Sequence, residues 1–311
     1  MKIYVGVTDS NWYYFLKELK CDEVNFWRPS GKTNFKAIDP NDIFLFKLRS
    51  PYNYIVGGGF FVRYSILPLF LAWDAFGEKN GAYSLEELNK SIKRYRSNSN
   101  IPDYNYNIGC IILNKPFFFE ESDWIPVPRD WAPNIVQGKT YDTNTEIGHQ
   151  LYQQVTERLQ MISGEHRTAT GEEPSDFRIY GKEQIIRPRL GQGAFRIVVT
   201  EAYSRKCSIT GERTLPVLDA AHIMPFSQKG PSITQNGILL RTDIHALFDK
   251  GYLTITDDLK VEVSRRLKED YGNGKIYYPY HGKSLANLPL NKSDMPAKEF
   301  LQWHNQNIYL G

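Results

Sequence analysis

Three short blocks in the last third of the chain decide its fold. They read LDAAHIMP at residues 218–225, NGILLR at residues 236–241 and TDIHALFDKG at residues 242–251. The first block is mostly apolar and predicts a short strand that ends near His222. The second opens with an Asn-Gly pair, typical of a turn that enters a strand. The third predicts a helix of two turns that stops at Gly251.

The order strand, loop, strand and helix resembles the HNH endonuclease family, also called ββα-metal nucleases. The resemblance covers residues 187–267. It is closest to a subgroup with the patterns A-A-H-I-x-P, N-G-hydrophobic-L-L-R and D-I-H-x-L-F-D-x-G, all present here in order. It implies a metal-dependent DNA endonuclease that hydrolyses phosphodiester bonds, with His222, Asn236 and His245 as catalytic residues.

Two of these residues have roles that the family resemblance implies. His222 corresponds to the general base, and an imidazole with an ordinary pKa near 6.5 suits proton transfer close to neutral pH. The alternative is a structural histidine satisfied by hydrogen bonds. Asn236 corresponds to the central Asn, which holds the loop between the strands, and its alternative is a plain Asn-Gly turn.

The metal site is expected around His245. Asp249 lies four residues later, so both side chains project from one helix face and would bind a divalent cation, Mg²⁺ or Mn²⁺, with other divalent ions as alternatives. Asp219 is a further metal ligand, although three residues along a regular strand separate it from the face of His222 unless a bulge intervenes. Many HNH enzymes carry a metal ligand where this chain has Ala221, which leaves the second ligand open. Asp249 is equally compatible with a helix-end carboxylate.

The net charge of +3 is too small to establish a nucleic-acid partner. However, basic residues outnumber acidic ones between Arg178 and Arg213, as a phosphate-binding surface requires. Arg187, Arg189 and Arg241 are predicted to bind DNA phosphates through charge-assisted hydrogen bonds. Ordinary surface arginines are the alternative.

The first half of the chain shows alternating apolar runs typical of strands, together with helical segments. Strands are expected at Lys2–Val7, Ile43–Leu48, Tyr54–Val62 and Ile108–Leu113, and helices at Ile66–Phe76, from Ser84 onward and at Thr143–Met161. The Gly-, Glu-, Thr- and Pro-rich stretch Ser163–Asp176 predicts a linker. Together these segments predict an α+β domain before the linker.

The order of features in this half resembles the PUA-like superfamily, which includes EVE, YTH, ASCH and SRA domains. These features are an opening strand, Trp12, Trp27 in a loop, the block DPNDIFLFK at residues 39–47 and a strand around residues 55–61, with Asn41 where the family has Gly. The resemblance implies a mixed β-barrel that accepts one flipped base in an aromatic pocket. We expect that pocket among Trp12, Phe26, Trp27 and Trp73, with core packing as the alternative for each.

The predicted fold is therefore α+β, with an N-terminal PUA-like mixed β-barrel domain (1–150), a helix and linker (151–184) and a C-terminal HNH nuclease domain (185–311). The pairing indicates a restriction enzyme that cuts double-stranded DNA carrying modified cytosine. Alternatives are a ligand- or partner-gated nuclease effector of antiviral defence, and a DNA-binding regulator with a decayed HNH site. Cutting both strands with one site per chain favours a homodimer.

Cellular location is indicated by two absences. Cys21, Cys110 and Cys207 have no paired spacing, which argues against a disulfide scaffold and favours a reducing cytoplasm. No apolar run approaches the roughly 20 residues that span a bilayer. We therefore expect a cytoplasmic protein without a membrane anchor.

Overall fold

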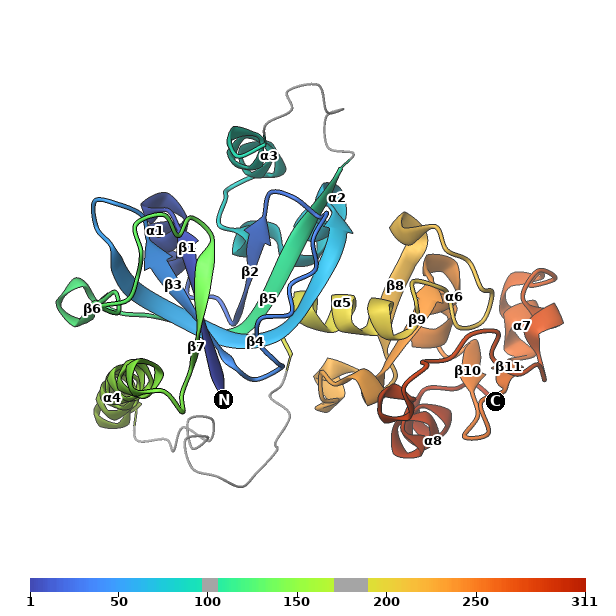
Figure 1. Ribbon diagram of the computed structural model, residues 1–311. Coiled ribbons are helices and arrows are strands. Elements are labelled where there is room, and N and C mark those ends of the chain that lie inside the picture. Colours follow the sequence, from blue (N-terminus) through green and yellow to red (C-terminus); the bar gives the residue numbers. More distant parts are fainter. Residues whose placement is uncertain (97–105, 171–189) are drawn as a thin grey trace. The chain divides into compact units, whose positions relative to one another are not determined.

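The computed structural model of the chain describes residues 1–96, 106–170 and 190–311, with the backbone alone for 163–170. The chain forms two compact units, Met1–Pro188 and Arg189–Gly311 (Figure 1). Each unit is described by itself.

The first unit is a mixed α/β assembly around one sheet. Its elements are β1 (Lys2–Thr8), α1 (Ser10–Leu19), β2 (Glu23–Arg28), β3 (Ile43–Leu48), β4 (Tyr54–Pro68), α2 (Leu69–Phe76), the 3-10 turn η1 (Gly77–Asn80), α3 (Leu85–Arg94), β5 (Asn107–Phe118), η2 (Glu121–Asp123), β6 (Ile125–Pro126), β7 (Gly138–Asp142) and α4 (Glu146–Thr170). The strand order is β2-β5-β4-β3-β1-β7, with β6 on β4. Since β1 and β3 run parallel and the other pairs antiparallel, the predicted mixed sheet is confirmed.

The predicted closed barrel is wrong for the described residues, because the edge strands β2 and β7 share no ladder. A side-chain contact joins the two edges instead. Arg28, at the end of β2, donates from Nη2 to Oε1 of Gln137, just before β7, over 2.7 Å. The sheet is therefore open in its backbone hydrogen bonding.

Both faces of the sheet are covered. Alternate residues of β3 face opposite sides, as the period of a strand requires. Phe44 and Phe46 join the cluster that α1 covers, whereas Ile43 and Leu45 join the cluster that α4 covers. The helix α4 therefore packs on the first unit.

Several sequence expectations needed correction. Trp27 lies on β2, opposite Cys110 of β5, and not in a loop. The helix expected from Ile66 starts only at Leu69, because residues 66–68 continue β4 and pair with β5. The first part of the predicted linker is helical, since α4 runs to Thr170. Apolar runs fit either period, and pairing with a neighbouring strand decides between them.

The helix predicted at Ser84 is confirmed. Ser84 is the N-cap of α3, and its Oγ accepts a hydrogen bond from the backbone N–H of Glu87 over 3.2 Å. This contact satisfies one of the N–H groups that the first helical turn leaves without an intrahelical partner.

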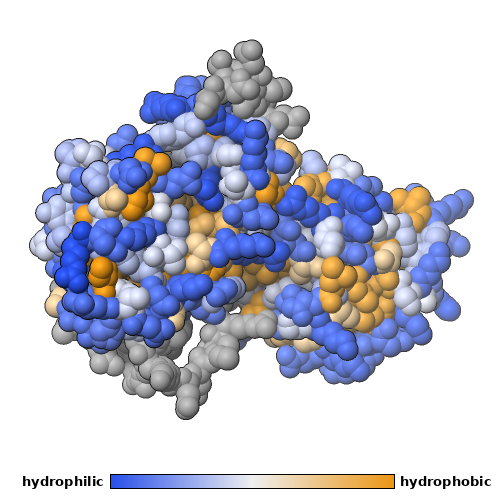
Figure 2. All heavy atoms as spheres, in the orientation of Figure 1, coloured by the Kyte–Doolittle hydropathy of each residue, from blue (hydrophilic) through white to orange (hydrophobic). Residues whose placement is uncertain are grey.

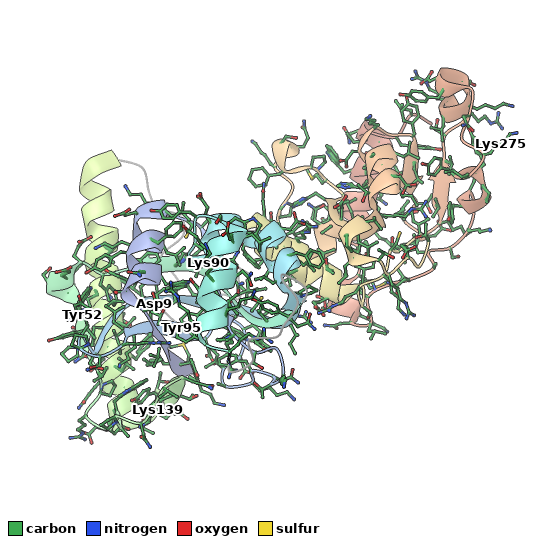
Figure 3. All side chains as sticks on the ribbon, turned by 90° about the horizontal axis from the view of Figure 1, so that it is seen from above. Asp9, Tyr52, Lys90, Tyr95, Lys139 and Lys275 are labelled. Carbon is green, nitrogen blue, oxygen red and sulfur yellow. The ribbon has the colours of Figure 1, made fainter. Side chains whose placement is uncertain are left out.

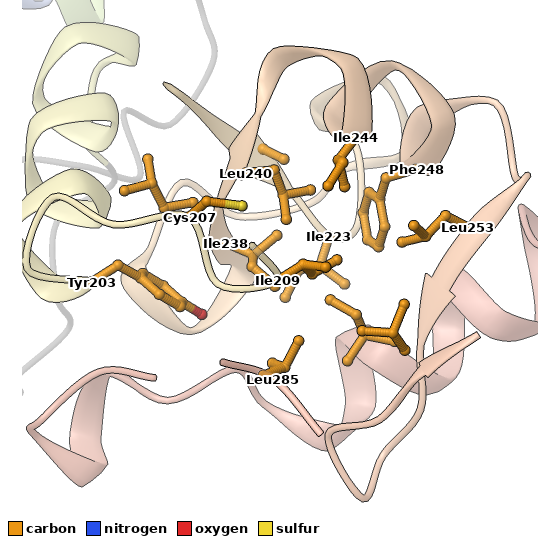
Figure 4. Close-up of a cluster of buried hydrophobic side chains, with 14 of the residues drawn as sticks. Tyr203, Cys207, Ile209, Ile223, Ile238, Leu240, Ile244, Phe248, Leu253 and Leu285 are labelled. Atoms are coloured by element: carbon orange, nitrogen blue, oxygen red, sulfur yellow. The ribbon is translucent and has the colours of Figure 1, made fainter. Parts of the chain in front are cut away.

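The second unit contains the predicted strand, loop, strand and helix. Its elements are α5 (Gln192–Ala202), η3 (Leu215–Val217), β8 (Leu218–His222), η4 (Phe226–Gln228), η5 (Thr234–Asn236), β9 (Gly237–Arg241), α6 (Thr242–Asp249), β10 (Leu253–Ile255), β11 (Val261–Val263), α7 (Arg266–Tyr271), η6 (Tyr278–Tyr280), η7 (Lys292–Asp294) and α8 (Lys298–Asn307). Figure 4 shows side chains such as Tyr203, Ile238 and Phe248 meeting in one core. This core joins α5, the β8–β9 hairpin and α6.

The surface seen in Figure 2 is mostly hydrophilic, with scattered hydrophobic side chains, as is ordinary for folded proteins. Within the described ranges, no helix combines the length and apolar character needed to cross a membrane.

Candidate functional site

The β8–β9 hairpin is a regular ladder from Leu218 opposite Arg241 to His222 opposite Gly237. Gly237 begins β9 in an extended conformation, so the Asn-Gly pair is not a hairpin turn. A Cβ at Gly237 would lie 2.4 Å from Cγ2 of Val199 and 3.0 Å from Cζ of Phe195. Glycine is required there because α5 packs directly against the hairpin.

His222 ends β8 and is half-buried. Its imidazole stacks on the ring of Phe195 from α5, with centroids 3.8 Å apart and planes inclined by 10°. Its Nε2 lies 3.4 Å from Oγ of Ser232. The stack restrains the ring plane while part of the side chain stays accessible.

Asn236 is completely buried and holds the loop that follows His222. Its Oδ1 accepts from the N–H of Met224 over 2.8 Å, and its Nδ2 donates to the carbonyls of Met224 and Pro231 over 2.9 and 3.0 Å. Its own carbonyl accepts from the N–H of Ile223 over 2.9 Å. This geometry is that of a loop-holding residue, and Asn236 makes no ordinary hairpin turn.

His245, on α6, lies between two carboxylates. Its Nδ1 is 3.4 Å from Oδ2 of Asp219 on β8, and its Nε2 is 3.3 Å from Oδ2 of Asp249 at the end of α6. Burial alone would lower the pKa of His245, but the carboxylates of Asp249 and Asp219 outweigh burial and raise that pKa. The structure thus brings together the three residues predicted as metal ligands.

Asp219 and His222 face opposite sides of the hairpin. No register shift interrupts the β8–β9 ladder, so residues three apart project in opposite directions. Asp219 contacts His245 of α6, whereas His222 stacks on Phe195 of α5. The expected bulge is absent from this ladder, and α6 reaches Asp219 without one.

The residues present fit a metal ion only in part. Within residues 1–96, 106–170 and 190–311, no group of three or more His, Cys, Asp or Glu side chains is arranged around one metal position. The physical reason is that Asp219 and Asp249 contact opposite nitrogens of His245. One imidazole nitrogen with one carboxylate is nevertheless a usable donor set, because Mg²⁺ commonly takes one or two protein carboxylates and completes its shell with water and substrate phosphate.

The predicted phosphate-binding arginines have different outcomes. Arg241 donates from Nε and Nη2 to both carboxylate oxygens of Asp243, over 2.6 and 2.8 Å, and Tyr277 donates to the same carboxylate over 3.2 Å. Arg241 is thus engaged in a bidentate ion pair on its own chain. Arg187 and Arg189 lie outside the described residues.

The first unit contains a cavity of about 1020 Å³. Three of the predicted pocket residues, Trp12, Phe26 and Trp27, line it, whereas Trp73, on α2, does not. Asp9 and Tyr95, labelled in Figure 3, line it from the start of α1 and the end of α3. The cavity therefore lies where β1, β2 and β3 end.

Asn80 fixes two tryptophans of the cavity wall. Its carbonyl accepts hydrogen bonds from the indole Nε1 of Trp12 and of Trp27, each over 3.1 Å. Its fully buried side chain is bonded to Asn25 and to the carbonyls of Ala72 and Gly77. Because Trp12 is almost completely buried and Trp27 only half-buried, Trp27 offers more of its ring to a ligand.

Sequence reasoning missed Lys47, Asn53 and Trp131, all of which line the cavity. One signal was present: Lys47 is the only charged residue in the apolar run IFLFKL at residues 43–48. Charged residues are rarely buried without a reason. The contribution of Trp131 has no comparable local signal, because it comes from a long connection before β7.

Comparisons with known proteins agree with the arrangement in the second unit. Residues 207–256 match the family model described as HNH endonuclease. A search of curated protein sequences finds no significant match.

Two solved structures are similar at low identity. A ZmASCH mutant protein from Zymomonas mobilis has 9% identity and a TM-score of 0.34, over 49% of this chain and 98% of that chain. A modification-dependent TagI restriction endonuclease has 15% identity and a TM-score of 0.27, over 92% of this chain and 75% of that chain. Neither likeness adds to the family match, in which residues 207–256, with the β8–β9–α6 core, form an HNH endonuclease region and make this chain a nuclease.

Proposed function

We propose that this protein is a divalent-metal-dependent restriction endonuclease that cuts double-stranded DNA carrying a modified cytosine. The carrying observation is that one chain combines an HNH region with an aromatic cavity large enough for a base. In this proposal the second unit hydrolyses the phosphodiester bond and the first unit selects the substrate.

His222 acts as the general base in the proposed reaction. It takes a proton from the attacking water, and Phe195 restrains its ring by stacking. Asn236 acts as a positioning residue, since its three side-chain hydrogen bonds hold the loop directly after His222. General base catalysis of this kind contributes roughly 10²- to 10⁴-fold to a rate.

His245 and Asp219 are the proposed metal ligands, with Asp249 as the orienting partner. A histidine ligand usually donates its second ring N–H to a carboxylate, and Asp249 lies at Nε2 of His245 for that purpose. Asp219 shares β8 with His222, so an ion held there would lie beside the strand that carries the base. A bound divalent cation would offset negative charge that develops on the phosphate.

The cavity supports recognition of a base withdrawn from the duplex. Chemistry or recognition on one base requires its removal from the stack, and stacking on aromatic side chains offsets that cost. Trp27 and Trp131 line the cavity and keep part of their surface exposed. Lys47 and Asn53 supply polar groups beside them.

The test is cleavage of matched DNA duplexes that carry unmodified, 5-methyl-, 5-hydroxymethyl- or glucosylated cytosine. Wild-type protein and His222→Ala are compared with Mg²⁺, with Mn²⁺ and with chelator. We expect metal-dependent cutting of modified DNA alone and its loss in His222→Ala. The matched control is His281→Ala, a histidine of the same unit that accepts a backbone hydrogen bond and lies outside the HNH region.

Other results would change the proposal. Equal cutting of all four duplexes would keep the nuclease and remove the selection of modified cytosine. Cutting that begins only after a small nucleotide is added would favour a ligand-gated effector. Full activity of His222→Ala would show that another group is the base.

A further inference from the structure

Lys47 is a buried ammonium group in a strand of apolar residues. It is 4% exposed, and every residue of β3 (Ile43–Leu48) is buried. Burial of a charge is costly unless the group is paired or hydrogen bonded. The cavity wall is where this lysine ends, so its charge faces space that a ligand can enter.

The partners of Lys47 leave part of its hydrogen-bonding capacity for a ligand. Its Nζ donates to Oδ1 of Asn53 over 2.7 Å and lies 5.3 Å from the ring centre of Trp131. No ion pair found among the described residues includes Lys47. An ammonium has three donors, so one acceptor and one aromatic face do not exhaust it. Burial also lowers the pKa of Lys47.

The backbone around Lys47 is irregular in two places. The β3–β4 ladder shifts register between Phe46 and Lys47, as Phe46 pairs with Gly57 and Lys47 with Ile55. Bulges of this kind often redirect side chains beside functional sites. Asn53 has φ of 54°, in the left-handed region that asparagine tolerates better than most residues. Both features direct side chains that meet in the cavity.

The cavity is larger than a cytosine needs. Pockets that bury a drug-sized ligand usually measure about 300–1,000 Å³. At about 1020 Å³, this cavity has room for a base with a bulky substituent. Its aromatic wall suits a ring face, whereas Lys47 requires an acceptor atom.

We propose that Lys47 is the specificity-determining residue of this cavity and selects a cytosine whose 5-substituent carries oxygen acceptors, of the hydroxymethyl or glucosyl type, over 5-methylcytosine. Asn53 and Trp131 are the positioning residues that hold its ammonium. A methyl group offers no acceptor to Lys47 and leaves most of the cavity unfilled. This inference rests on the proposed recognition of modified cytosine.

Binding of labelled DNA duplexes to the full chain tests the inference. Fluorescence anisotropy is measured with chelator present, so that no cutting occurs, on duplexes with cytosine, 5-methyl-, 5-hydroxymethyl- or glucosylated cytosine. A hydrogen bond to a charged group is worth roughly tenfold or more in affinity. We expect wild-type protein to bind an oxygen-bearing duplex at least about tenfold more tightly than the 5-methyl duplex, and Lys47→Met to lose that preference alone.

The control variant is Lys90→Met. Lys90 lies on α3, pairs with Glu86 across one helical turn and is absent from the cavity wall, so its preference should equal that of wild type (Figure 3). Lys47→Met keeps the length of the side chain and removes a buried charge, which favours folding. If circular dichroism nevertheless shows that it is unfolded, Asn53→Gly serves instead, because it permits the same φ and removes the acceptor.

The outcomes separate this inference from the proposed function. Equal or absent binding of all four duplexes would overturn both. A preference for modified over unmodified DNA that ignores the oxygen, or survives Lys47→Met, would overturn the role of Lys47 alone. Competition by free 5-hydroxymethyl-deoxycytidine monophosphate as strong as by the duplex would show that the recognised cytosine comes from a small molecule, and would overturn the selection of DNA.

Discussion

Two histidines of the second unit make nearly the same ring contact in different surroundings. His222 stacks on Phe195 and His304 on Phe248, each with centroids 3.8 Å apart and planes inclined by 10° and 11°. His222 ends a strand at a half-buried position. His304 lies within α8 and is 2% exposed.

Hydrogen bonding separates the two sites further. Nδ1 of His304 lies 2.8 Å from Oγ1 of Thr254, and its Nε2 lies 3.1 Å from the carbonyl oxygen of Phe248. Burial lowers the pKa of His304 to about 4. A stacked histidine is therefore no mark of catalysis by itself: burial and internal partners make His304 structural, whereas the accessible His222 suits proton transfer.

The largest expected effect comes from removing each imidazole. His222→Ala should lower the cleavage rate by roughly 10²- to 10⁴-fold, as for loss of a general base. His304→Ala should leave the rate constant of the folded protein nearly unchanged but reduce the free energy of unfolding by about 2–4 kcal/mol, because it leaves a buried cavity and unpaired polar groups. Single-turnover cleavage at low temperature and urea unfolding measure the two effects. A reversed pattern would assign the roles wrongly here.

Asn236 should give the next largest effect. Asn236→Ala removes three buried side-chain hydrogen bonds and should lower the free energy of unfolding by about 2–4 kcal/mol. Asn236→Asp presents a carboxylate to two carbonyls, so it should be less stable at pH 8 than at pH 5, where protonation restores a donor. Urea unfolding at both pH values checks this. Equal stability of Asn236→Asp at both would contradict the loop-holding geometry.

The pH dependence of stability should have opposite signs at His304 and His245. The pKa of His304 is lowered in the folded state, so its contribution is complete above pH 6.5 and is lost as pH falls toward 4. One pKa unit corresponds to about 1.4 kcal/mol, which makes this loss roughly 3 kcal/mol. The pKa of His245 is raised, so its contribution is present below pH 6.5 and is lost as pH rises through the raised value.

Urea unfolding in chelator, compared between wild type and His304→Gln or His245→Gln across pH 4–9, measures both contributions. His304→Gln should flatten the acid side of the profile, whereas His245→Gln should destabilise most at low pH. The same slope in both variants would contradict the difference in their surroundings.

The smallest effect is expected at the stacking rings. Phe195→Leu keeps an apolar side chain but removes a contact worth about 0.5–1.5 kcal/mol, so cleavage should fall a few-fold through poorer orientation of His222. Phe248→Leu should lower the melting temperature and leave the rate constant of the folded protein unchanged. Equal kinetics of the two variants would show that the stack on Phe195 does not orient the base.

The catalytic region was largely accessible to sequence reasoning because its residues lie within 28 positions, from 222 to 249, and follow one local pattern. His222, Asn236 and His245 fall on the strand, loop and helix that their neighbours predict. The cavity was accessible only in part. Trp12, Phe26 and Trp27 were expected there, but Trp73 was an error, since an aromatic residue in an apolar helix shows no direction in the sequence.

The sequence by itself determined the α+β class, the order of sheet unit and ββα region, and the nuclease motif, because strand and helix periods and the spacing of His, Asn and His are local properties. Only the tertiary structure decided that the sheet stays open, that His245 lies between Asp219 and Asp249, and that Lys47 meets Asn53 and Trp131. These features depend on strand pairing and on contacts between residues distant in the chain. Such contacts are selected by the packing of the whole unit, which no short window of sequence contains.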